Sequence, residues 1–521
     1  MGNFCLIESE VLYLKKVYID GEHLSLEDVI NVARHYYEVA IDKSVLENIE
    51  NSRKIVEKFA EEEKVIYGIT TGFGELCNVF ISNDKTEKLQ RNLIRSHACG
   101  IGDPLDIETV RAIMLLRANS LVKGFSGIRL STIQSLIDMI NKKVHPIIPE
   151  KGSLGASGDL APLAHMVLPM IGEGEAYYEG KRLNGKEAMK LAGIDTINLV
   201  AKEGLALING TQVMTAIGAL SIYDSIELLK TADIISSLSF EALNGVIEAF
   251  DERVHNLRPH KGQIGSANNL RKILEGSKMV SHQGALRVQD AYSLRCIPQV
   301  HGASRDAVNY VEDIIVKEMN AATDNPLIFS KEEEAISAGN FHGQPIALGM
   351  DFLAIALSEI ANISERRIER LVNPKLSGLP PFLIEESGLN SGFMLVQYSA
   401  ASLVSENKVL AHPASVDSIP SSANQEDHVS MGTIAARKAK NILNNVQKVL
   451  AMEMLCACQA IDLRGNKGLG KGSKIVYDIV RDKVPKITED RAMYEMIDKC
   501  EEILKSGIIV KEVEKETGKL F

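Results

Sequence analysis

The stretch SMGTIAARKAKNILNNVQKVLAMEMLCACQAIDL, residues 430–463, decides the fold class of this chain. It is rich in Ala, Leu and Ile, holds a single glycine near its start and contains no proline. Its length exceeds that of an ordinary globular helix, which averages about 10–14 residues. Four further stretches share this composition and have few internal breakers: residues 211–240, 303–320, 346–371 and 391–410. Helices of this length predict a bundle in which they run nearly parallel.

Toward the N-terminus the pattern changes, because the chain before about residue 200 is rich in loops and glycine. Residues 105–123 and 130–142 predict two shorter helices. Residues 175–182, followed by Asn184-Gly185, and residues 327–337 predict two small hairpins. We therefore expect an all-α (mainly α) protein. A loop-rich N-terminal portion, residues 1–205, should precede a long central helix bundle at 206–480 and a helical periphery at 481–521.

Composition excludes several classes of protein. Lys plus Arg is 58 and Asp plus Glu is 69, so the formal charge is 58 − 69 = −11, which argues against nucleic-acid or anionic-membrane partners. The apolar stretch 160–172 is too short to span a bilayer, and Glu8 and Glu10 interrupt any N-terminal signal core. The seven cysteines are odd in number and scattered, which favours a reducing cytoplasm over a disulfide framework.

The stretch GSLGASGDL, residues 152–160, carries the most unusual chemistry. One interpretation is a flexible turn before a helix that Asp159 caps. The other is chemical. If the backbone bends tightly, the nitrogen of Gly158 can attack the carbonyl carbon of Ala156, and Gly158 has no Cβ to obstruct the bend. Loss of water from the ring and from the Ser157 hydroxyl then leaves an exocyclic methylene, which is an electrophile that no ordinary side chain offers.

Five further blocks accompany this stretch in the order YGITTGFG (67–74), EGLALINGT (203–211), QDAYSLRCIPQV (289–300), GNFHGQP (339–345) and SANQEDHVSMG (422–432). Together with GSLGASGDLAPLAH (152–165), they resemble the histidine and aromatic amino-acid ammonia-lyase family. The resemblance implies an ammonia-lyase/fumarase-like fold and an electrophile, 4-methylideneimidazole-5-one, formed from Ala156, Ser157 and Gly158 without a metal or a diffusible cofactor. It also implies a homotetramer whose active sites combine residues of three chains.

The resemblance assigns roles that each compete with a structural explanation. Tyr67 would remove the β-proton of the substrate, although it could also be a core tyrosine. Because the reference pKa of tyrosine is about 10, it would need neighbouring donors or positive charge to act as a base. Arg295 would grip the substrate carboxylate through two hydrogen bonds, although it could be a surface arginine. Three residues would line the site and stabilise negative charge: Asn209, Gln289 and Tyr292. Phe341 would form an apolar wall, or simply pack in the core.

His97 and Glu426 would select the substrate. The Ser96-His97 pair resembles the histidine-specific branch of the family, and Glu426 stands where lyases for aromatic substrates carry an amide. An imidazole offers N–H donors to a carboxylate, whereas a phenyl ring would leave that carboxylate desolvated and unpaired. His97 could instead be a structural histidine, and Glu426 an acid at a helix N-terminus. The expected reaction is β-elimination of ammonia from L-histidine to give trans-urocanate, the first step of histidine degradation.

Thr70 departs from the pattern of many relatives, which carry Asn there. Thr also occurs among the related 2,3-aminomutases, so aminomutase chemistry stays open as an alternative, as does tyrosine or phenylalanine ammonia-lyase activity. A helical scaffold without catalysis is a further alternative, which the retention of Ala-Ser-Gly with Tyr67 and Arg295 disfavours.

Two rival sites are weaker. Residues 465–472, GNKGLGKG, nearly match a phosphate-binding loop, but Gly472 replaces the required Ser or Thr and a helical pattern precedes the loop. Cys456 and Cys458 are separated by one residue, which is not a metal-ligand spacing on a helix. We therefore predict neither a nucleotide site nor a metal site.

Overall fold

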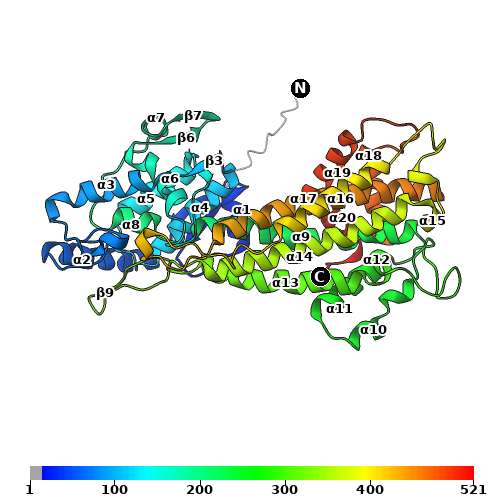
Figure 1. The fold of residues 1–521 in the computed structure, drawn as a ribbon, viewed down its shortest axis with the longest axis horizontal. Helices are drawn as coiled ribbons and strands as arrows, with labels where there is room; N and C mark the ends of the chain where they lie inside the picture. Colours follow the sequence, from blue (N-terminus) through cyan, green and yellow to red (C-terminus); the bar gives the residue numbers. More distant parts are fainter. Residues whose placement is uncertain (1–14) are drawn as a thin grey trace, which may run out of the picture. The chain divides into compact units, whose positions relative to one another are not determined.

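The computed structural model describes residues 15–521, so the N-terminal stretch with Glu8 and Glu10 lies outside the described residues. The described chain is mainly helical, which confirms the predicted fold class (Figure 1). It divides into two compact units. Unit 1 comprises the described residues up to Ala216 together with Val316–Gln344 and Ser418–Thr433, and unit 2 comprises Ile217–Ile315, Pro345–Asp417 and Ile434–Phe521. These units are interleaved along the chain, and the expected division at residues 205 and 480 stays a prediction.

Long helices that run side by side make up the body of unit 2 (Figure 1). They are α9 (Gln212–Ala242), α13 (Ile297–Met319), α14 (Gln344–Val372), α16 (Met394–Leu410) and α17 (Gly432–Arg464). The shorter helices of this unit are α10 (Glu252–Asn256), α11 (Lys261–Ile273), α12 (Tyr292–Arg295), α15 (Pro374–Ser377), α18 (Lys471–Lys483), α19 (Tyr494–Lys505) and α20 (Ile508–Thr517). Each of the five long helices that the sequence predicts is therefore present, with ends within three residues of the expected positions except the start of α13, which lies six residues earlier than expected.

Buried polar side chains tie these long helices to one another. The carboxylate of Glu453 on α17 accepts hydrogen bonds from Ser239 on α9 and from Ser364 on α14, both at 2.6 Å. The guanidinium of Arg367 on α14 donates to both oxygens of the same carboxylate, from Nε at 2.6 Å and from Nη2 at 2.8 Å. Because a buried charge is tolerated only when it is paired and hydrogen-bonded, this network favours one register of the helices over others.

Helix α14 is long and apolar enough to cross a membrane by length and composition alone. However, 72% of its most apolar 18-residue window is buried inside the structure. The C-terminal half of α14 also carries Glu365, Arg366 and Arg367. These properties are typical of a core helix, which can pass the same composition test.

Unit 1 contains shorter elements. Its helices are α1 (Leu26–Ala33), α2 (Leu46–Glu61), α3 (Thr86–His97), α4 (Ile107–Val122), α5 (Leu130–Asn141), α6 (Leu160–Val167), α7 (Gly185–Leu191) and α8 (Glu203–Ile208). Its strands are β1 (Lys16–Ile19), β2 (Glu38–Ile41), β3 (Ile101–Pro104), β4 (His145–Pro146), β5 (Pro149–Lys151), β6 (Glu175–Tyr178), β7 (Lys181–Asn184), β8 (Leu327–Phe329) and β9 (Glu334–Ile336). The pairs β1–β2 (parallel), β3–β5 and β8–β9 (antiparallel) and the antiparallel order β4-β6-β7 form small sheets.

Helix α4 is the core of unit 1, because every residue from Thr109 to Val122 is buried. It therefore packs on all sides, and it includes two fully buried arginines, Arg111 and Arg117. A helix that is surrounded in this way shows little amphipathic periodicity, in contrast to a surface helix.

Both predicted hairpins are present, and one differs in its turn. Strands β6 and β7 pair from Glu175 with Asn184 to Tyr178 with Lys181, so the turn lies at Glu179-Gly180. Asn184 instead caps helix α7, since its side chain accepts the Glu187 N–H at 2.9 Å. Asn-Gly in this sequence therefore marks a helix start, which is the other structure that Asn favours.

Candidate active site

A cavity of about 660 Å³ opens within unit 1. Six of the residues that line it have roles assigned from the sequence: Tyr67, His97, Ser157, Asn209, Phe341 and Glu426. Leu160, which ends the stretch 152–160, lines it as well. A smaller cavity of about 220 Å³ shares His97, Ser157, Leu160 and Glu426 and adds Ala156 and Gly158. Side chains far apart in the sequence therefore converge on Ser157.

The Ala-Ser-Gly segment is held by a backbone that bends tightly. Gly158 has φ +70°, and a Cβ there would lie 2.2 Å from the carbonyl oxygen of Gly210, so only glycine fits. The N–H of Asp159 donates to that same carbonyl at 2.7 Å. On the other side, the Ser430 hydroxyl donates to the carbonyl of Gly155 at 2.9 Å. The segment is thus fixed at both ends.

Asp159 has a different role from the one expected. Its carboxylate makes no cap of α6 but accepts the N–H groups of Val213 and Met214, both at 2.9 Å, at the start of α9. It also accepts the hydroxyls of Ser153 and Thr433. Burial raises the pKa of Asp159 despite these donors. The carboxylate therefore joins the Ala-Ser-Gly segment to the first turn of a long helix.

Tyr67 lies in a loop that packs against a buried cluster of unit 1. Ile66 and Ile69 pack in a core cluster with Val56, Phe59 and Ile328. The Tyr67 ring meets Phe73 edge to face at 6.3 Å, and the Tyr67 hydroxyl oxygen accepts the Gly74 N–H at 3.3 Å. A donor to the phenol oxygen stabilises its anionic form, as a tyrosine base requires.

His97 ends helix α3 and is half-buried at the cavity. Its Nδ1 lies 2.9 Å from the Leu93 carbonyl and 3.1 Å from the Ser96 hydroxyl. Burial lowers the pKa of His97, and the Leu93 carbonyl and the charge of Glu426 only partly oppose that effect. A neutral ring that donates from Nδ1 leaves Nε2 as a hydrogen-bond acceptor.

Glu426 directly contacts the Ala-Ser-Gly segment. The Ser157 hydroxyl donates to Glu426 Oε1 at 2.7 Å, and the Ser421 hydroxyl donates to Oε2 at 2.8 Å. The backbone of residue 426 pairs with that of Ser421 in a short antiparallel bridge. The alternative role as an acid at a helix N-terminus is not what the structure shows, since α17 begins only at Gly432.

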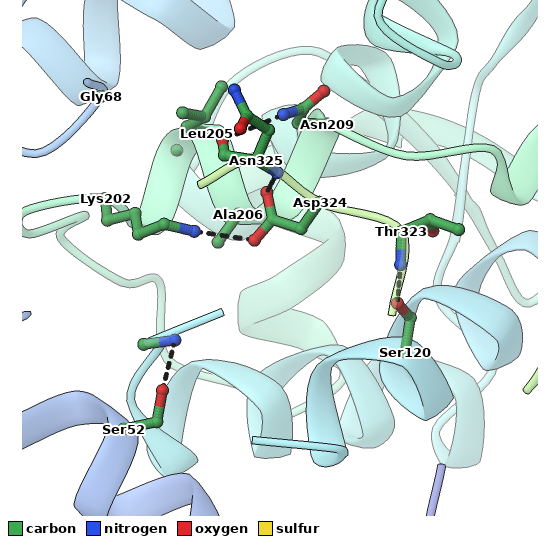
Figure 2. A network of polar contacts seen from close by, with 12 residues as sticks. Ser52, Gly68, Ser120, Lys202, Leu205, Ala206, Asn209, Thr323, Asp324 and Asn325 are labelled. Atoms are coloured by element: carbon green, nitrogen blue, oxygen red, sulfur yellow. Dashed lines mark hydrogen bonds and ion pairs between the residues drawn. The ribbon is translucent and has the colours of Figure 1, made fainter. Parts of the chain in front are cut away.

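Asn209 follows helix α8 and lines the cavity. Its Nδ2 donates to the carbonyl of Asn325 at 3.1 Å (Figure 2), and its buried Oδ1 has no hydrogen-bond partner in the part of the chain that the structure describes. Phe341 contributes a half-buried ring to the same cavity.

Gln289, Tyr292 and Arg295 belong to unit 2 and do not line this cavity. Tyr292 is 69% exposed, and the Arg295 guanidinium lies over its ring at 4.5 Å. The two residues occupy one turn of α12, as their three-residue spacing predicts.

Known proteins share both the sequence pattern and the fold of this chain. The family described as aromatic amino acid lyase matches residues 24–482. The chain belongs to the aromatic amino acid lyase family. It is 63% identical over 502 residues to a histidine ammonia-lyase of Alkaliphilus oremlandii, covering 96% of this chain and 99% of that protein. A solved histidine ammonia-lyase from Trypanosoma cruzi superposes with TM-score 0.90 at 42% identity, over 96% and 95% of the two chains. A tyrosine aminomutase from Streptomyces globisporus gives TM-score 0.93 at 39% identity, over 97% of this chain and all of that one (100%).

Within this lyase, Thr70 is buried and does not line the cavity. Its hydroxyl accepts the Ile66 N–H at 3.0 Å and donates to the Lys64 carbonyl. Both hydrogen bonds therefore stay within the loop that carries Tyr67. The neighbouring Thr71 is the loop threonine that reaches the cavity lining.

The glycine-rich loop at 465–472 follows helix α17 in this lyase. The N–H of Gly470 donates to the Glu241 carboxylate at 2.7 Å, so this loop N–H is already paired with a side chain of the same protein. Among the residues that the structure describes, no group of three or more His, Cys, Asp or Glu is arranged to hold a metal ion. The expected absence of a metal stays a prediction.

Sequence reasoning missed several cavity residues of this lyase, namely Val65, Asn78, Leu93, Leu205, Asn325, Ser337, Ala338, Ser422 and Gln425. Asn325 and Ser337 flank the second hairpin, and the Asn325-Pro326 pair was a turn signal that could have drawn attention to this segment. Ser422 and Gln425 stood inside a block already chosen for Glu426.

Proposed function

We propose that the protein is a histidine ammonia-lyase, which removes ammonia from L-histidine to give trans-urocanate. The observation that carries the proposal is the convergence of Tyr67, His97, Ser157 and Glu426 on one cavity. Relatives with 58–63% identity over nearly their whole length bear that name, which supports the assignment.

The residues present fit the electrophile that the family implies. Ser157 presents its hydroxyl to the cavity, Gly158 adopts a backbone conformation that needs glycine, and hydrogen bonds hold the segment at both ends. Ala156, Ser157 and Gly158 would hold the 4-methylideneimidazole-5-one group, which supplies an electrophilic methylene for the substrate amine. No other cofactor and no metal enter the proposal.

Tyr67 is proposed to accept the β-proton. Its phenol oxygen already accepts the Gly74 N–H, and the cavity wall beside it is formed by Phe73 and Phe341. A positioned general base contributes typically about 10²–10⁴-fold to the rate.

Glu426 and His97 are proposed to hold the imidazole. The Ser157 hydroxyl, which ring formation removes as water, is the donor that Glu426 Oε1 accepts now. Its loss frees this oxygen for an imidazole N–H. His97 Nε2 offers a second acceptor, so the pair suits an imidazole that carries N–H on both nitrogens.

The carboxylate site is proposed to come from neighbouring chains. Arg295, Tyr292 and Gln289 do not line the cavity, yet a guanidinium is the natural partner of a carboxylate. In a homotetramer whose sites combine residues of three chains, these residues would complete the site. We propose that this tetramer works in the cytoplasm, in keeping with the free thiols of Cys99, Cys296 and Cys456.

A 2,3-aminomutase is the second candidate, because tyrosine aminomutase shares the fold and Thr70 is found among such enzymes. The placement of Thr70 inside its own loop weakens that argument, since the side chain has no direct access to substrate.

Incubation of the purified protein with L-histidine, L-tyrosine and L-phenylalanine tests the proposal. We expect rapid growth of the ultraviolet absorbance of urocanate from L-histidine, with release of one ammonia for each urocanate. Faster turnover of either aromatic substrate, or formation of a β-amino acid without ammonia, would refute it.

A further inference from the structure

Arg117 on α4 is a fully buried cation whose hydrogen-bond partners among residues 15–521 include no carboxylate. Its guanidinium instead donates hydrogen bonds to oxygens of three segments. Nη2 donates to the Ala206 carbonyl at 2.5 Å, and Nη1 lies 2.7 Å from Gln212 Oε1 and 3.3 Å from the carbonyls of Asn209 and Thr323. It therefore joins the end of α8, the start of α9 and the segment before β8.

The guanidinium is also separated from Gly158 of the Ala-Ser-Gly segment by one residue, Gly210. A Cβ on Gly210 would be 2.3 Å from Arg117 Nη1, so Gly210 is pressed against the cation. The carbonyl of Gly210 faces the other way, toward Gly158, where a Cβ would be only 2.2 Å from it. The Arg117 guanidinium thus packs against Gly210 and donates hydrogen bonds to residues before and after it, Asn209 and Gln212, while Gly210 packs against Gly158.

A second buried pair, Lys202 and Asp324, holds the segment before β8, which Arg117 also contacts at Thr323. Lys202 Nζ lies 2.7 Å from Asp324 Oδ2, and Asp324 Oδ1 accepts the Asn325 N–H at 2.7 Å (Figure 2). Asn325 in turn accepts from Asn209. Because Lys202 already neutralises Asp324, Arg117 acts through carbonyl oxygens rather than through an ion pair.

We propose that Arg117 is a positioning residue for ring closure at Ala156-Ser157-Gly158, an inference that rests on the proposed function. In that step the Gly158 nitrogen bonds to the Ala156 carbonyl carbon. The carbonyl oxygen leaves as water with the N–H protons of Gly158 and Ser157, and a second water takes the Ser157 hydroxyl and its Cα proton. By holding Gly210, Arg117 keeps Gly158 bent toward Ala156.

Lysine cannot replace this guanidinium. It would keep the charge, but its single ammonium cannot reach four oxygens that surround a planar fork. Burial lowers the pKa of Arg117 to about 10, so the cation persists at neutral pH and must stay solvated by these oxygens.

Arg111 on the same helix provides a matched control. It is also buried, its pKa is also lowered to about 10 by burial, and it also serves carbonyls, those of Val32 and Ile140. None of its hydrogen-bond partners belongs to the electrophile segment or to α8. Comparison of variants at Arg111 and Arg117 thus separates the general effect of losing a buried guanidinium from the specific effect of losing Arg117.

The test is intact-mass spectrometry of the full chain as wild type, Arg117→Lys and Arg111→Lys, with denaturant unfolding of each. Two waters make the closed form lighter by about 36 Da, from the stoichiometry of the condensation. We expect wild type and Arg111→Lys to be fully dehydrated, and Arg117→Lys to be dehydrated in less than about a tenth of chains while it unfolds no earlier than Arg111→Lys. Equal dehydration in the two variants, whether complete or reduced, would overturn the inference.

If Arg117→Lys does not fold, Gln212→Glu is the second variant, because it keeps an acceptor at 2.7 Å from the arginine; Gln212→Met is compared with it, since Met removes that acceptor together with the bond that Gln212 Nε2 donates to the Thr323 hydroxyl. We expect dehydration of Gln212→Met to be slower than that of Gln212→Glu by several-fold during refolding, and equal rates would overturn the inference. Absence of the mass deficit in wild type would refute the proposed electrophile itself, which distinguishes the two failures.

Discussion

Replacement of Glu426 by glutamine tests substrate recognition most directly. The carboxylate accepts from Ser157 at 2.7 Å and from Ser421 at 2.8 Å. Glutamine preserves the length of the side chain and one oxygen, but it removes the charge and turns one acceptor into a donor. The hydroxyl of Ser421 can adapt to either group, because it can donate or accept.

The expected size follows from the lost contact. A hydrogen bond between the imidazole N–H and a charged carboxylate contributes about 1.5–3 kcal/mol. At about 1.4 kcal/mol for each factor of ten, kcat/KM for L-histidine should fall about 10- to 100-fold. L-phenylalanine has no N–H on its ring, so its kcat/KM should change by less than about threefold or rise, since an unpaired carboxylate no longer has to lose its water.

The assay measures kcat/KM for both amino acids by ultraviolet absorbance, after intact mass has shown that dehydration at Ser157 is complete. Ser421→Ala is the matched control, because it removes one neutral donor and leaves the carboxylate. Its loss should stay below about tenfold. Equal losses with the two substrates in Glu426→Gln would show that the carboxylate does not read the imidazole, and the reasoning would fail.

Four further outcomes are expected. Ser157→Ala should keep its unfolding midpoint but lose turnover and the mass deficit; a rate like that of wild type would remove Ser157 from its role. Tyr67→Phe should lower kcat by about 10²–10⁴-fold, and a loss under tenfold would disqualify it as the base. Burial lowers the pKa of His145 to about 4, so the unfolded chain binds a proton between pH 6.5 and about 4 that the folded chain does not. Stability should therefore fall by about 2 kcal/mol from pH 7 to pH 5, and less in His145→Phe, as measured by denaturant unfolding. Activity should survive exhaustive chelation, and a loss that added divalent cation restores would contradict the absence of a metal.

The long helices could be predicted because their signal is local. Residues 430–463 hold enough helix-forming side chains that tertiary contacts only trim the ends, and α17 indeed spans Gly432–Arg464. The turn of the first hairpin was misplaced for an equally local reason. Asn184 suits both a turn and a helix start, and only the pairing of Tyr178 with Lys181 decides between them.

The candidate site was predictable only where residue type alone limits the chemistry. Ala-Ser-Gly is such a case, since few triplets can condense. The contact between Ser157 and Glu426 spans 269 residues, and no periodicity or spacing reveals it. Arg117 is a second residue whose contacts cannot be predicted from the sequence. Within the apolar pattern of α4 it looks like a surface arginine, and only the structure places it among four oxygens.

Buried cations in this protein therefore divide by their partners. Lys202 meets a carboxylate, and removal of either member would leave an unpaired buried charge, which costs about 3–5 kcal/mol. Arg117 meets four neutral oxygens, so its complete removal leaves no charge unpaired but costs about 1–3 kcal/mol for each oxygen that cannot find water, a sum comparable with or larger than the cost at Lys202. Arg117→Lys keeps the charge and retains a donor for some of these oxygens, so it costs less than complete removal. For this reason ring closure is tested with Arg117→Lys and compared with Arg111→Lys, which separates an effect on ring closure from an effect on stability.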